Sequence, residues 1–255
     1  MLKKERQRKI LEIIERSGKV EVEQLANTLA VSVMTVRRDL TELDELGFIE
    51  RVHGGALLPH QKNGGEELPV LERSKVKIEI KERIGRAVAG LINDGEKIFL
   101  GSGSTTAAIA SALLHRRDLT VFTNAINIAN ILMVAPQIKV AIIGGFLRKS
   151  ELSLIGYFAE NALHGLQVDK LVIGIRGIDP VKGLTSDNME ELLTDQAIMN
   201  TSKTVIVAAD HSKFGHVAAI RTAPITAVTK IITNFGGPKD ILQAIRQMGI
   251  QIIEV

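Results

Sequence analysis

The spacing of apolar residues at the start of the chain predicts a helix-turn-helix. Apolar side chains recur at helical intervals over residues 3–16 and again over residues 23–29, and a short strand-like segment, KVEV, lies between the two stretches. After a turn at residues 30–31, the same periodicity runs from about residue 33 to residue 46. We therefore expect three helices, with a tight turn before the last one.

The third predicted helix carries side chains that suit a DNA reader. Ser32 can accept hydrogen bonds from the free amides of the first helical turn. The face expected to pack into a core consists of Val36, Leu40 and Leu43. The other face places Thr35, Arg37 and Arg38 within one turn of the amino end, where a recognition helix meets base edges and phosphates. The alternative is a surface helix on which both arginines are simply solvated.

A short β-structure is expected directly after this helix. Gly47 ends the helical period, and residues 48–52 alternate between apolar and polar side chains before a His-Gly-Gly turn. This pattern is typical of a two-stranded wing. Residues 1–57 are therefore predicted to form a winged helix-turn-helix domain.

The rest of the chain alternates short apolar strands with helical stretches. Residues 58–72 contain paired glycines, a proline and no apolar period, so we interpret them as a linker. A charged amphipathic helix is expected over residues 73–91. Apolar runs predict strands at 97–101, 119–124, 139–145, 170–175, 204–210, 230–234 and 250–255, and helices at 106–114, 126–133, 189–202 and 238–248. Residues 73–255 are therefore predicted to form an α/β domain with a mainly parallel sheet covered on both faces.

Polar and glycine residues follow these strands, at the edge where parallel α/β sheets bind ligands. After the first strand, backbone amides, hydroxyls and a positive helix end can converge on one anion at Ser102, Gly103, Ser104, Thr105 and Thr106. Other strand ends add Thr123, Asn124, Gly144, Gly145, Arg148, Asp210 and Lys213. Taken singly, each is equally well explained by a turn or a surface ion pair. Together they predict a sugar-phosphate pocket. Since the segment lacks both the P-loop lysine and the full dinucleotide fingerprint, no nucleotide cofactor is expected.

Composition narrows the classes of protein without selecting one. The chain has 255 residues, 45% of them apolar and 24% charged, as in globular proteins. Cys is absent, which excludes disulfides and cysteine metal sites. Because no long apolar run resembles a signal peptide or a membrane span, a cytoplasmic location is expected. The net charge of +3 leans basic, but the first sixty residues are balanced, so a DNA-binding interpretation depends on where the cations cluster.

The amino-terminal pattern resembles the signature of the DeoR family of bacterial repressors. The resemblance covers roughly the first sixty residues and rests on Arg6, Ile10, Ile14, Ser32, Thr35, Val36, Arg37, Arg38, Asp39, Leu40, Gly47 and the ERVHGGA segment. In that family the pattern marks a winged helix-turn-helix that binds operator DNA. The resemblance implies that the DNA contacts come from Ser32, Thr35, Arg37 and Arg38 on the helix and from Arg51 and His53 on the wing.

The second half is similar to the carboxyl-terminal domain of DeoR regulators, which is related to ribose-5-phosphate isomerase and glucosamine-6-phosphate deaminase. The similarity rests on GSGSTT, VFTN, IIGGFLR, GIDPVKGLTS, DHSKFG and the Glu190–Glu191 pair. It implies a domain that senses a phosphorylated sugar, with Lys81 and Glu191 among the ligand's neighbours. Two positions depart from the family pattern, Arg176 and Asn234. They imply either a more anionic ligand or an Arg176 that points away from the pocket.

A sugar-phosphate isomerase or deaminase is the alternative, because Asp187, Glu190, Glu191 and Asp210 offer carboxylates for general base catalysis. However, nothing resembles the acidic cluster of the isomerases or the His-acid pair of the deaminases. His211 and His216 are more typical of surface residues than of bases or metal ligands. We therefore predict a regulator and not an enzyme, without cofactor or metal. It is expected to be a dimer or tetramer that binds operator DNA and is released by a phosphorylated sugar.

Overall fold

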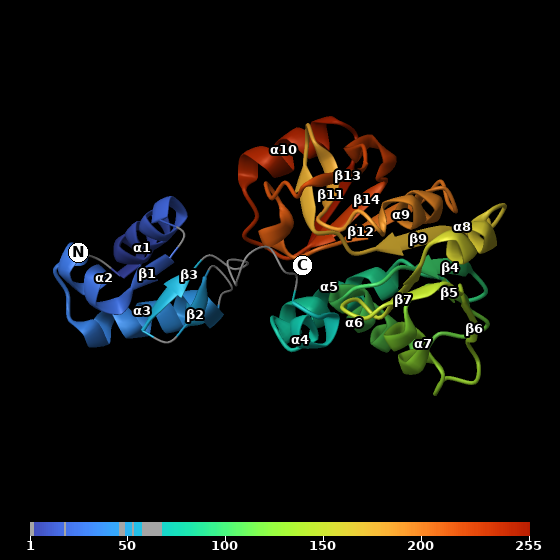
Figure 1. The fold of residues 1–255 in the computed structure, drawn as a ribbon, viewed down its shortest axis with the longest axis horizontal. Helices are drawn as coiled ribbons and strands as arrows, with labels where there is room; N and C mark the ends of the chain where they lie inside the picture. The colour runs from blue at the N-terminus through green and yellow to red at the C-terminus, as the bar shows by residue number, and fades with distance from the viewer. Residues whose placement is uncertain (1–2, 18, 46–48, 53, 58–67) are drawn as a thin grey trace. The chain divides into compact units, whose positions relative to one another are not determined.

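The computed structural model describes residues 3–17, 19–45, 49–52, 54–57 and 68–255. The chain divides into two compact units, residues 1–67 and residues 68–255 (Figure 1). None of the helices within the described ranges combines the length and apolar character needed to cross a membrane.

The amino-terminal unit contains three helices and a three-stranded antiparallel sheet. Its elements are α1 (Lys3–Ser17), β1 (Lys19–Glu21), α2 (Val22–Leu29), α3 (Val33–Glu45), β2 (Glu50–Val52) and β3 (Gly55–Leu57). The helices lie where the apolar spacing predicts them. The sheet has one strand more than the two-stranded wing that was predicted, because β1 joins β2 and β3 in the order β1-β3-β2. Gly55 makes this pairing possible, since a Cβ there would lie 2.0 Å from the carbonyl oxygen of Val20. Gly47, Phe48 and His53 lie outside the described residues.

The predicted inner face of α3 forms the centre of this unit's core. Val36, Leu40 and Leu43 are buried against apolar residues of α1 and α2. Asp39 is also buried, and it accepts hydrogen bonds from the guanidinium of Arg6 on α1, one of them 3.1 Å long. The buried ion pair and the apolar contacts together fix the orientation of α3, and therefore of its outer face.

The carboxyl-terminal unit is built on a seven-stranded parallel sheet with the strand order β15-β14-β12-β9-β4-β5-β6. The strands are β4 (Lys97–Leu100), β5 (Thr120–Thr123), β6 (Lys139–Ile142), β9 (Lys170–Ile173), β12 (Val205–Ala208), β14 (Lys230–Thr233) and β15 (Gln251–Glu254). One face packs against α5 (Ile78–Gly90), α6 (Ser104–Leu113) and α7 (Ile126–Leu132). The other packs against α8 (Tyr157–Leu163), α9 (Leu192–Met199) and α10 (Lys239–Gln247). The predicted α/β architecture is confirmed.

Both faces of this sheet are buried, which explains its uninterrupted Val and Ile runs. On β4, Ile98 and Leu100 belong to the core beneath α5, α6 and α7, whereas Phe99 belongs to the core on the opposite face. Successive side chains of a strand point to opposite faces, so a strand covered on both sides needs apolar residues at every position.

The first helical segment of this unit differs from the prediction. Instead of one helix over residues 73–91, there are two, α4 (Val70–Ser74) and α5, and Val70 is buried within what we interpreted as the linker. Lys77, the residue before α5, has the left-handed φ of 55° and interrupts the helix. Positive φ is uncommon for a residue with a Cβ, so the amphipathic spacing gave no sign of this break.

Several short elements without a periodic signal lie at the carboxyl edge of the sheet. They are β7 (Phe146–Arg148), β8 (Ser153–Ile155), β10 (Gly177–Asp179), β11 (Gly183–Ser186), β13 (Ile220–Ala223) and the 3₁₀ turn η1 (His211–Lys213). The β7–β8 hairpin is attached to the end of β5, because the Leu154 amide donates to the Asn124 carbonyl at 2.7 Å. Likewise the Gly215 amide donates to Ile178 on β10 at 2.8 Å. These connections bring distant segments to one edge of the sheet.

Candidate functional site

The amino end of α3 has the predicted cap. The Thr35 amide donates to Ser32 Oγ at 3.2 Å, and the two hydroxyl oxygens are 2.9 Å apart. Arg37 and Arg38 are exposed, and neither guanidinium has a hydrogen-bond or ion-pair partner among the residues that the structure describes. The outer face of α3 therefore offers two guanidiniums for phosphates or base edges.

The wing strand β2 is joined to the same helix. The Arg51 guanidinium donates to Thr41 Oγ1 at 2.9 Å, and its backbone amide donates to Asp44 Oδ1 at 3.1 Å. This places Arg51 beside the helix, while the other predicted wing residue, His53, lies outside the described residues. Met34 is 72% exposed and was not predicted. Its i, i+3, i+4 and i+7 spacing with Arg37, Arg38 and Thr41 is the signal that assigns it to the same face.

In the carboxyl-terminal unit, the strand order reverses direction between β4 and β9. From β4 the chain proceeds outward through β5 and β6, and it then returns to β9 and proceeds the other way through β12, β14 and β15. Such a reversal opens a crevice at the carboxyl ends of the two central strands, where α/β sheets bind ligands. Ser102 follows β4 and Gly174 follows β9, and a Cβ on Gly174 would lie 3.7 Å from the Ser102 carbonyl oxygen.

The predicted anion cradle lies beside this crevice, at the amino end of α6. Gly103 precedes the helix with a φ of 132°, and Ser102, Gly103 and Thr105 are partly exposed while Ser104 is buried. The amides of the first turn have no intrahelical acceptors, which suits an anion. The structure does not fit the predicted role of Thr106 in effector binding, because its hydroxyl is fully buried and donates to the Gly103 carbonyl at 2.9 Å.

At the end of β5, the two predicted residues have different roles. Thr123 is fully buried, and its Oγ1 accepts a hydrogen bond from the Ala125 amide at 3.1 Å, so its predicted contact with a ligand hydroxyl is not supported. Asn124 is 2% exposed and donates from Nδ2 to the Leu154 carbonyl at 3.2 Å, but its Oδ1 has no partner within the described part of the chain. Because β5 neighbours β4 in the sheet, this unsatisfied acceptor lies on the same side of the switch point as the cradle.

Of the two glycines after β6, Gly145 is required by the fold. Gly145 has a φ of 157°, and a Cβ there would lie 2.7 Å from the carbonyl oxygen of Ile155 on β8. A Cβ on Gly144 would meet nothing within 4 Å. The close backbone approach predicted for this pair is therefore made to β8 in the case of Gly145.

Arg148 and Glu191 were both predicted near the ligand, and the structure pairs them with each other. Arg148 Nη1 lies 2.9 Å from Glu191 Oε2, and Ser153 donates to Glu191 Oε1, also at 2.9 Å. Burial, together with the nearby Glu191, raises the pKa of Asp195 well above its usual range. Glu190, the other acid of the predicted pair, is exposed. The Arg148 charge is therefore balanced within the protein.

A buried carboxylate at the end of β12 organises several cations. Asp210 is 5% exposed and accepts hydrogen bonds from the Lys77 ammonium at 2.9 Å and from the Ser212 amide at 3.1 Å. Burial opposes its ionisation, but Lys77 and Lys213 hold the pKa of Asp210 below its usual range. Lys77 was not predicted as a site residue, because its position in a basic amphipathic stretch is also typical of a solvated lysine.

Lys213 has a different environment from Lys77, the other lysine near Asp210. Within the described part of the chain, no hydrogen-bond or ion-pair partner contacts its ammonium. Burial lowers the pKa of Lys213 to about 8, Asp210 opposes this effect, and the positive charges of Arg176, Arg73 and Lys77 add to it. An ammonium in such an environment gains stability from an anion.

Lys81 was predicted to face the ligand, but the structure gives it a positioning role. It is buried and donates to the backbone carbonyls of Arg73 and Val76, the latter at 2.8 Å, and burial lowers its pKa to about 8. Arg73 in turn forms an ion pair with Glu151 beside the β7–β8 hairpin. Lys81 therefore fixes the turn between α4 and α5, and Arg73 ties α4 to the hairpin.

The expectation that His211 lies on the surface is wrong. His211 is 7% exposed, its amide donates to Asn234 Oδ1 at 2.8 Å, and its Nδ1 is 2.7 Å from Asn234 Nδ2. Because the backbone amide fixes the carboxamide oxygen, Nδ2 must donate to the ring, which requires an unprotonated Nδ1. Burial and Lys77 lower the pKa of His211, in agreement with a neutral ring. An Asp in place of Asn234 would instead favour the charged imidazole.

Arg176, the other residue that departs from the family pattern, lies near Lys213 and His216. Its Nε donates to Asp187 Oδ2 at 3.1 Å, and its charge helps to lower the pKa values of Lys213 and His216, both of which burial lowers most. No group of three or more His, Cys, Asp or Glu residues in the described ranges is arranged to hold a metal ion.

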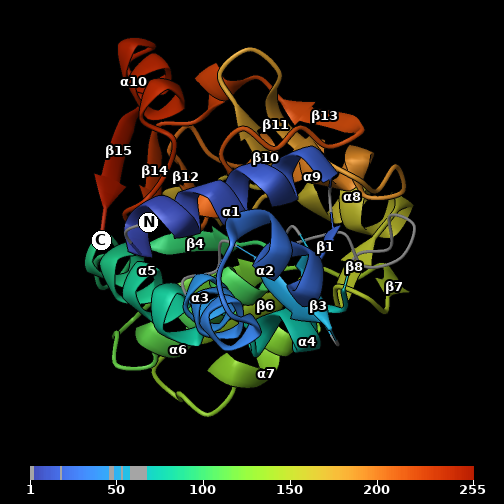
Figure 2. The same ribbon diagram turned by 90° about the vertical axis from the view of Figure 1, so that its left-hand side faces the viewer.

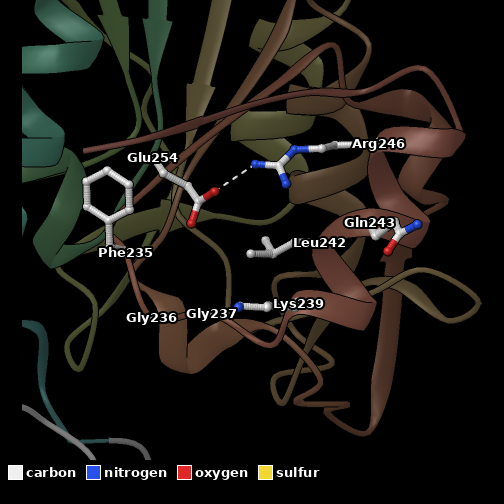
Figure 3. A pocket seen from close by; sticks show the side chains of 8 residues that line it. All are labelled: Phe235, Gly236, Gly237, Lys239, Leu242, Gln243, Arg246 and Glu254. Atoms are coloured by element: carbon white, nitrogen blue, oxygen red, sulfur yellow. Dashed lines mark hydrogen bonds and ion pairs between the residues drawn. The ribbon is translucent and has the colours of Figure 1, made fainter.

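A separate cavity of about 520 Å³ lies at the carboxyl ends of β14 and β15, beside α10 (Figure 3). It is lined by Phe235, Gly236, Gly237, Lys239, Leu242, Gln243, Arg246 and Glu254. Figure 3 shows the ion pair between Arg246 and Glu254, which are 2.7 Å apart. None of the predicted effector residues lines this cavity.

Comparison with known proteins gives matches over both units. The DeoR-like helix-turn-helix domain matches residues 6–62, and the DeoR C terminal sensor domain matches residues 76–234. The chain is 35% identical over 252 residues to the glycerol-3-phosphate regulon repressor of Escherichia coli (strain K12), covering 99% of each chain. It is also 35% identical over 236 residues to the transcriptional repressor GlcR of Bacillus subtilis (strain 168), covering 92% of this chain and 89% of GlcR.

The transcriptional repressor CsqR of Escherichia coli (strain K12) is 31% identical over 244 residues, covering 96% of this chain and 92% of CsqR. A D-ribose-5-phosphate isomerase in complex with phospho-erythronic acid matches 54% of each chain, at 20% identity and a TM-score of 0.40. The full-length relatives are repressors, which confirms the prediction of a regulator over that of an enzyme. The chain therefore belongs to the DeoR family of transcriptional repressors.

Proposed function

We propose that this chain represses a carbohydrate-utilisation operon and leaves its operator when a phosphorylated sugar binds at the β4–β9 switch point. One observation supports the proposal: groups that suit a phosphorylated sugar follow three strands of the same sheet, β4, β5 and β12. They are the free helix amides and the hydroxyls of Ser104 and Thr105, an unsatisfied buried acceptor on Asn124, and the Lys213 ammonium, which has no hydrogen-bond or ion-pair partner among the described residues. Amides and an ammonium suit a phosphate, and a carboxamide oxygen suits a sugar hydroxyl. Ser102 and Gly103 supply the turn that exposes these amides.

The same proposal assigns operator binding to the outer face of α3 and to β2. Arg37, Arg38 and Arg51 supply the charge that contacts phosphates, and Thr35 and Met34 lie at the helix end that approaches base edges. Two such helices spaced by a dimer or tetramer would read two operator half-sites in the cytoplasm. His53 on the wing stays part of the proposal.

For release from the operator, ligand binding must change the contacts of α4, the helix that follows the linker. Residues 58–67 lead directly to α4, which is held by the Arg73–Glu151 ion pair and by the hydrogen bond from Lys81 to the Arg73 carbonyl. Lys77, only three residues beyond α4, is tied to Asp210, whose other neighbouring cation is Lys213. An anion that attracts Lys213 weakens the attraction between Lys213 and Asp210. This changes the strength of the ion pair between Asp210 and Lys77.

The energetic demand on the ligand is moderate. To change operator occupancy from nearly full to nearly empty, the ligand must favour the released state by about 5.5 kcal/mol. Hydrogen bonds to charged groups contribute roughly 1.5–3 kcal/mol each. Two to four such bonds to one phosphate are therefore sufficient.

The test is a titration of the purified protein on DNA from upstream of its own gene, repeated with a panel of phosphorylated sugars and with glycerol 3-phosphate. We expect specific binding that one phosphorylated compound relieves. The double variant Ser104→Ala/Thr105→Ala should bind DNA normally but need a higher ligand concentration for release. Ser111→Ala, near the other end of α6, is the matched control.

Two results would contradict the proposal. Unchanged release of the Ser104→Ala/Thr105→Ala variant would remove both hydroxyls of the cradle from the ligand site. Absence of DNA binding at moderate salt, combined with consumption of a phosphosugar, would favour the enzyme alternative.

A further inference from the structure

Three aromatic side chains form an exposed cluster on the carboxyl-terminal unit, which we call the aromatic patch: Phe146, Tyr157 and Phe158. Their exposed fractions are 66%, 71% and 62%. The ring centroids of Phe146 and Phe158 are 5.9 Å apart, and those of Tyr157 and Phe158 are also 5.9 Å apart. The three rings therefore form one contiguous surface and are not scattered apolar residues.

Aromatic residues are rare in this chain. It contains only seven Phe, one Tyr and no Trp, and three of these residues stand in the patch. The fold also fixes their positions, because Phe146 on β7 packs over Gly156, where a Cβ would lie 3.3 Å from its ring. Tyr157 and Phe158 begin α8 directly after that glycine. Figure 2 shows β7, β8 and α8 on the same side of the unit.

We propose that the aromatic patch is the interface through which two copies of this chain associate. A stable interface buries about 800 Å² on each partner, and in homodimers about 65% of that area is apolar, which is roughly 500 Å². An aromatic side chain can bury about 150–250 Å², so three rings that are two-thirds exposed offer roughly 300–500 Å². The patch therefore supplies most of the apolar centre of a dimer interface.

The chemistry of the patch fits a second copy better than another partner. None of the three rings carries a charge, which agrees with the depletion of charge at interface centres, whereas nucleic acid binding depends on cations that contact phosphates. A two-fold axis through the patch would place the same three rings of both copies against each other. Nearby β6 is an outermost strand of the parallel sheet, and it adds Ile142, which is 53% exposed.

This inference rests on the proposed function only where that function needs two recognition helices acting together. Its test is the mass of the full chain in solution, measured by sedimentation over a range of protein concentrations without DNA or sugar phosphate. Because neither ligand is present, the result tests the proposed interface and does not depend on the proposed effector site. Phe158→Glu is the test variant, and Phe235→Glu is the matched control, because Phe235 is an equally exposed Phe, 67%, in the same unit.

We expect a dimer for the parent and for Phe235→Glu, and a dissociation constant raised roughly 30-fold or more for Phe158→Glu, as for an aromatic at an interface centre. Tyr157→Ser, which introduces no charge, should weaken the dimer in the same direction. Circular dichroism and the melting temperature establish that each variant is folded. A monomeric parent would overturn the proposal, as would a folded Phe158→Glu that dimerises like the parent, or equal weakening by both Glu variants.

Discussion

The affinity for a phosphorylated effector should fall as the pH rises from 7 to 9, because Lys213 loses its proton in this range. Burial lowers the pKa of Lys213 to about 8. A phosphate monoester has its second pKa near 6, so the ligand stays doubly charged throughout. The ligand is expected to bind the protonated ammonium. Deprotonating Lys213 above pH 8 therefore removes one charge-assisted contact.

The size of the effect follows from proton linkage. With a pKa of about 8, Lys213 is mostly protonated at pH 7 and mostly neutral at pH 9. If only the protonated form binds the phosphate, the dissociation constant should rise about tenfold between these two pH values, which corresponds to about 1.4 kcal/mol. Isothermal titration calorimetry in buffers of different ionisation enthalpy should also detect proton uptake on binding near pH 8.5.

Replacing Lys213 separates this group from the other titrating groups. Lys213→Arg keeps a positive charge over the whole range, so it should bind the ligand with little change between pH 7 and pH 9. Lys213→Met should bind weakly at both values. An affinity of the parent that does not change with pH would refute the reasoning. The same decline in Lys213→Arg would instead assign the titration to Lys81, whose pKa is also about 8.

Two further outcomes test the recognition helix and the Asp210 cluster. Arg37→Ala and Arg38→Ala should each weaken operator binding by roughly 1–3 kcal/mol, and loss of a phosphate contact should also flatten the salt dependence; fluorescence anisotropy at several salt concentrations measures both, and parental affinity in both variants would contradict the assignment. Lys77→Met should lower the free energy of unfolding in urea by about 1–3 kcal/mol, because buried Asp210 loses one of its cations. Lys75→Met, which breaks only an exposed ion pair, should change it by less than about 0.5 kcal/mol, and equal losses would count against the cluster.

The parts of the fold that the sequence predicts are those with a strong apolar period. Helix α3 and its Ser32 cap lie where the spacing indicates, and the uninterrupted apolar runs in β4 and β12 belong to a sheet buried on both faces. Three-residue strands such as β7 and β10 contain too few positions for a period of two to be recognised. The left-handed φ of Lys77 could not be predicted either, since lysine has no preference for it.

For the candidate site, the sequence selects residues at the ends of parallel strands but does not predict their contacts with one another. The rule that ligands bind at the carboxyl ends of parallel strands was enough to select Asn124, Asp210 and Lys213. Sequence spacing does not tell which charges pair across the fold, however. Arg148 and Glu191 are far apart along the chain, and only the structure shows that each balances the other. The contact between His211 and Asn234 was missed for the same reason, since Asn234 follows a different strand, β14.

Lys81 and Lys213 show why the pairing matters more than the burial. Burial lowers the pKa of each to about 8, so both are disfavoured as cations by the same effect. The Lys81 ammonium has two carbonyl acceptors that hold α4 against α5, whereas Lys213 has no partner within the described residues. A partly buried charge without a direct partner, as on Lys213, is less favourable than one with acceptors unless something else compensates it. Sites of this kind cluster where ligands bind. Under the proposed function, an anion beside Lys213 would therefore stabilise its ammonium, which lies near the ion pair between Asp210 and Lys77.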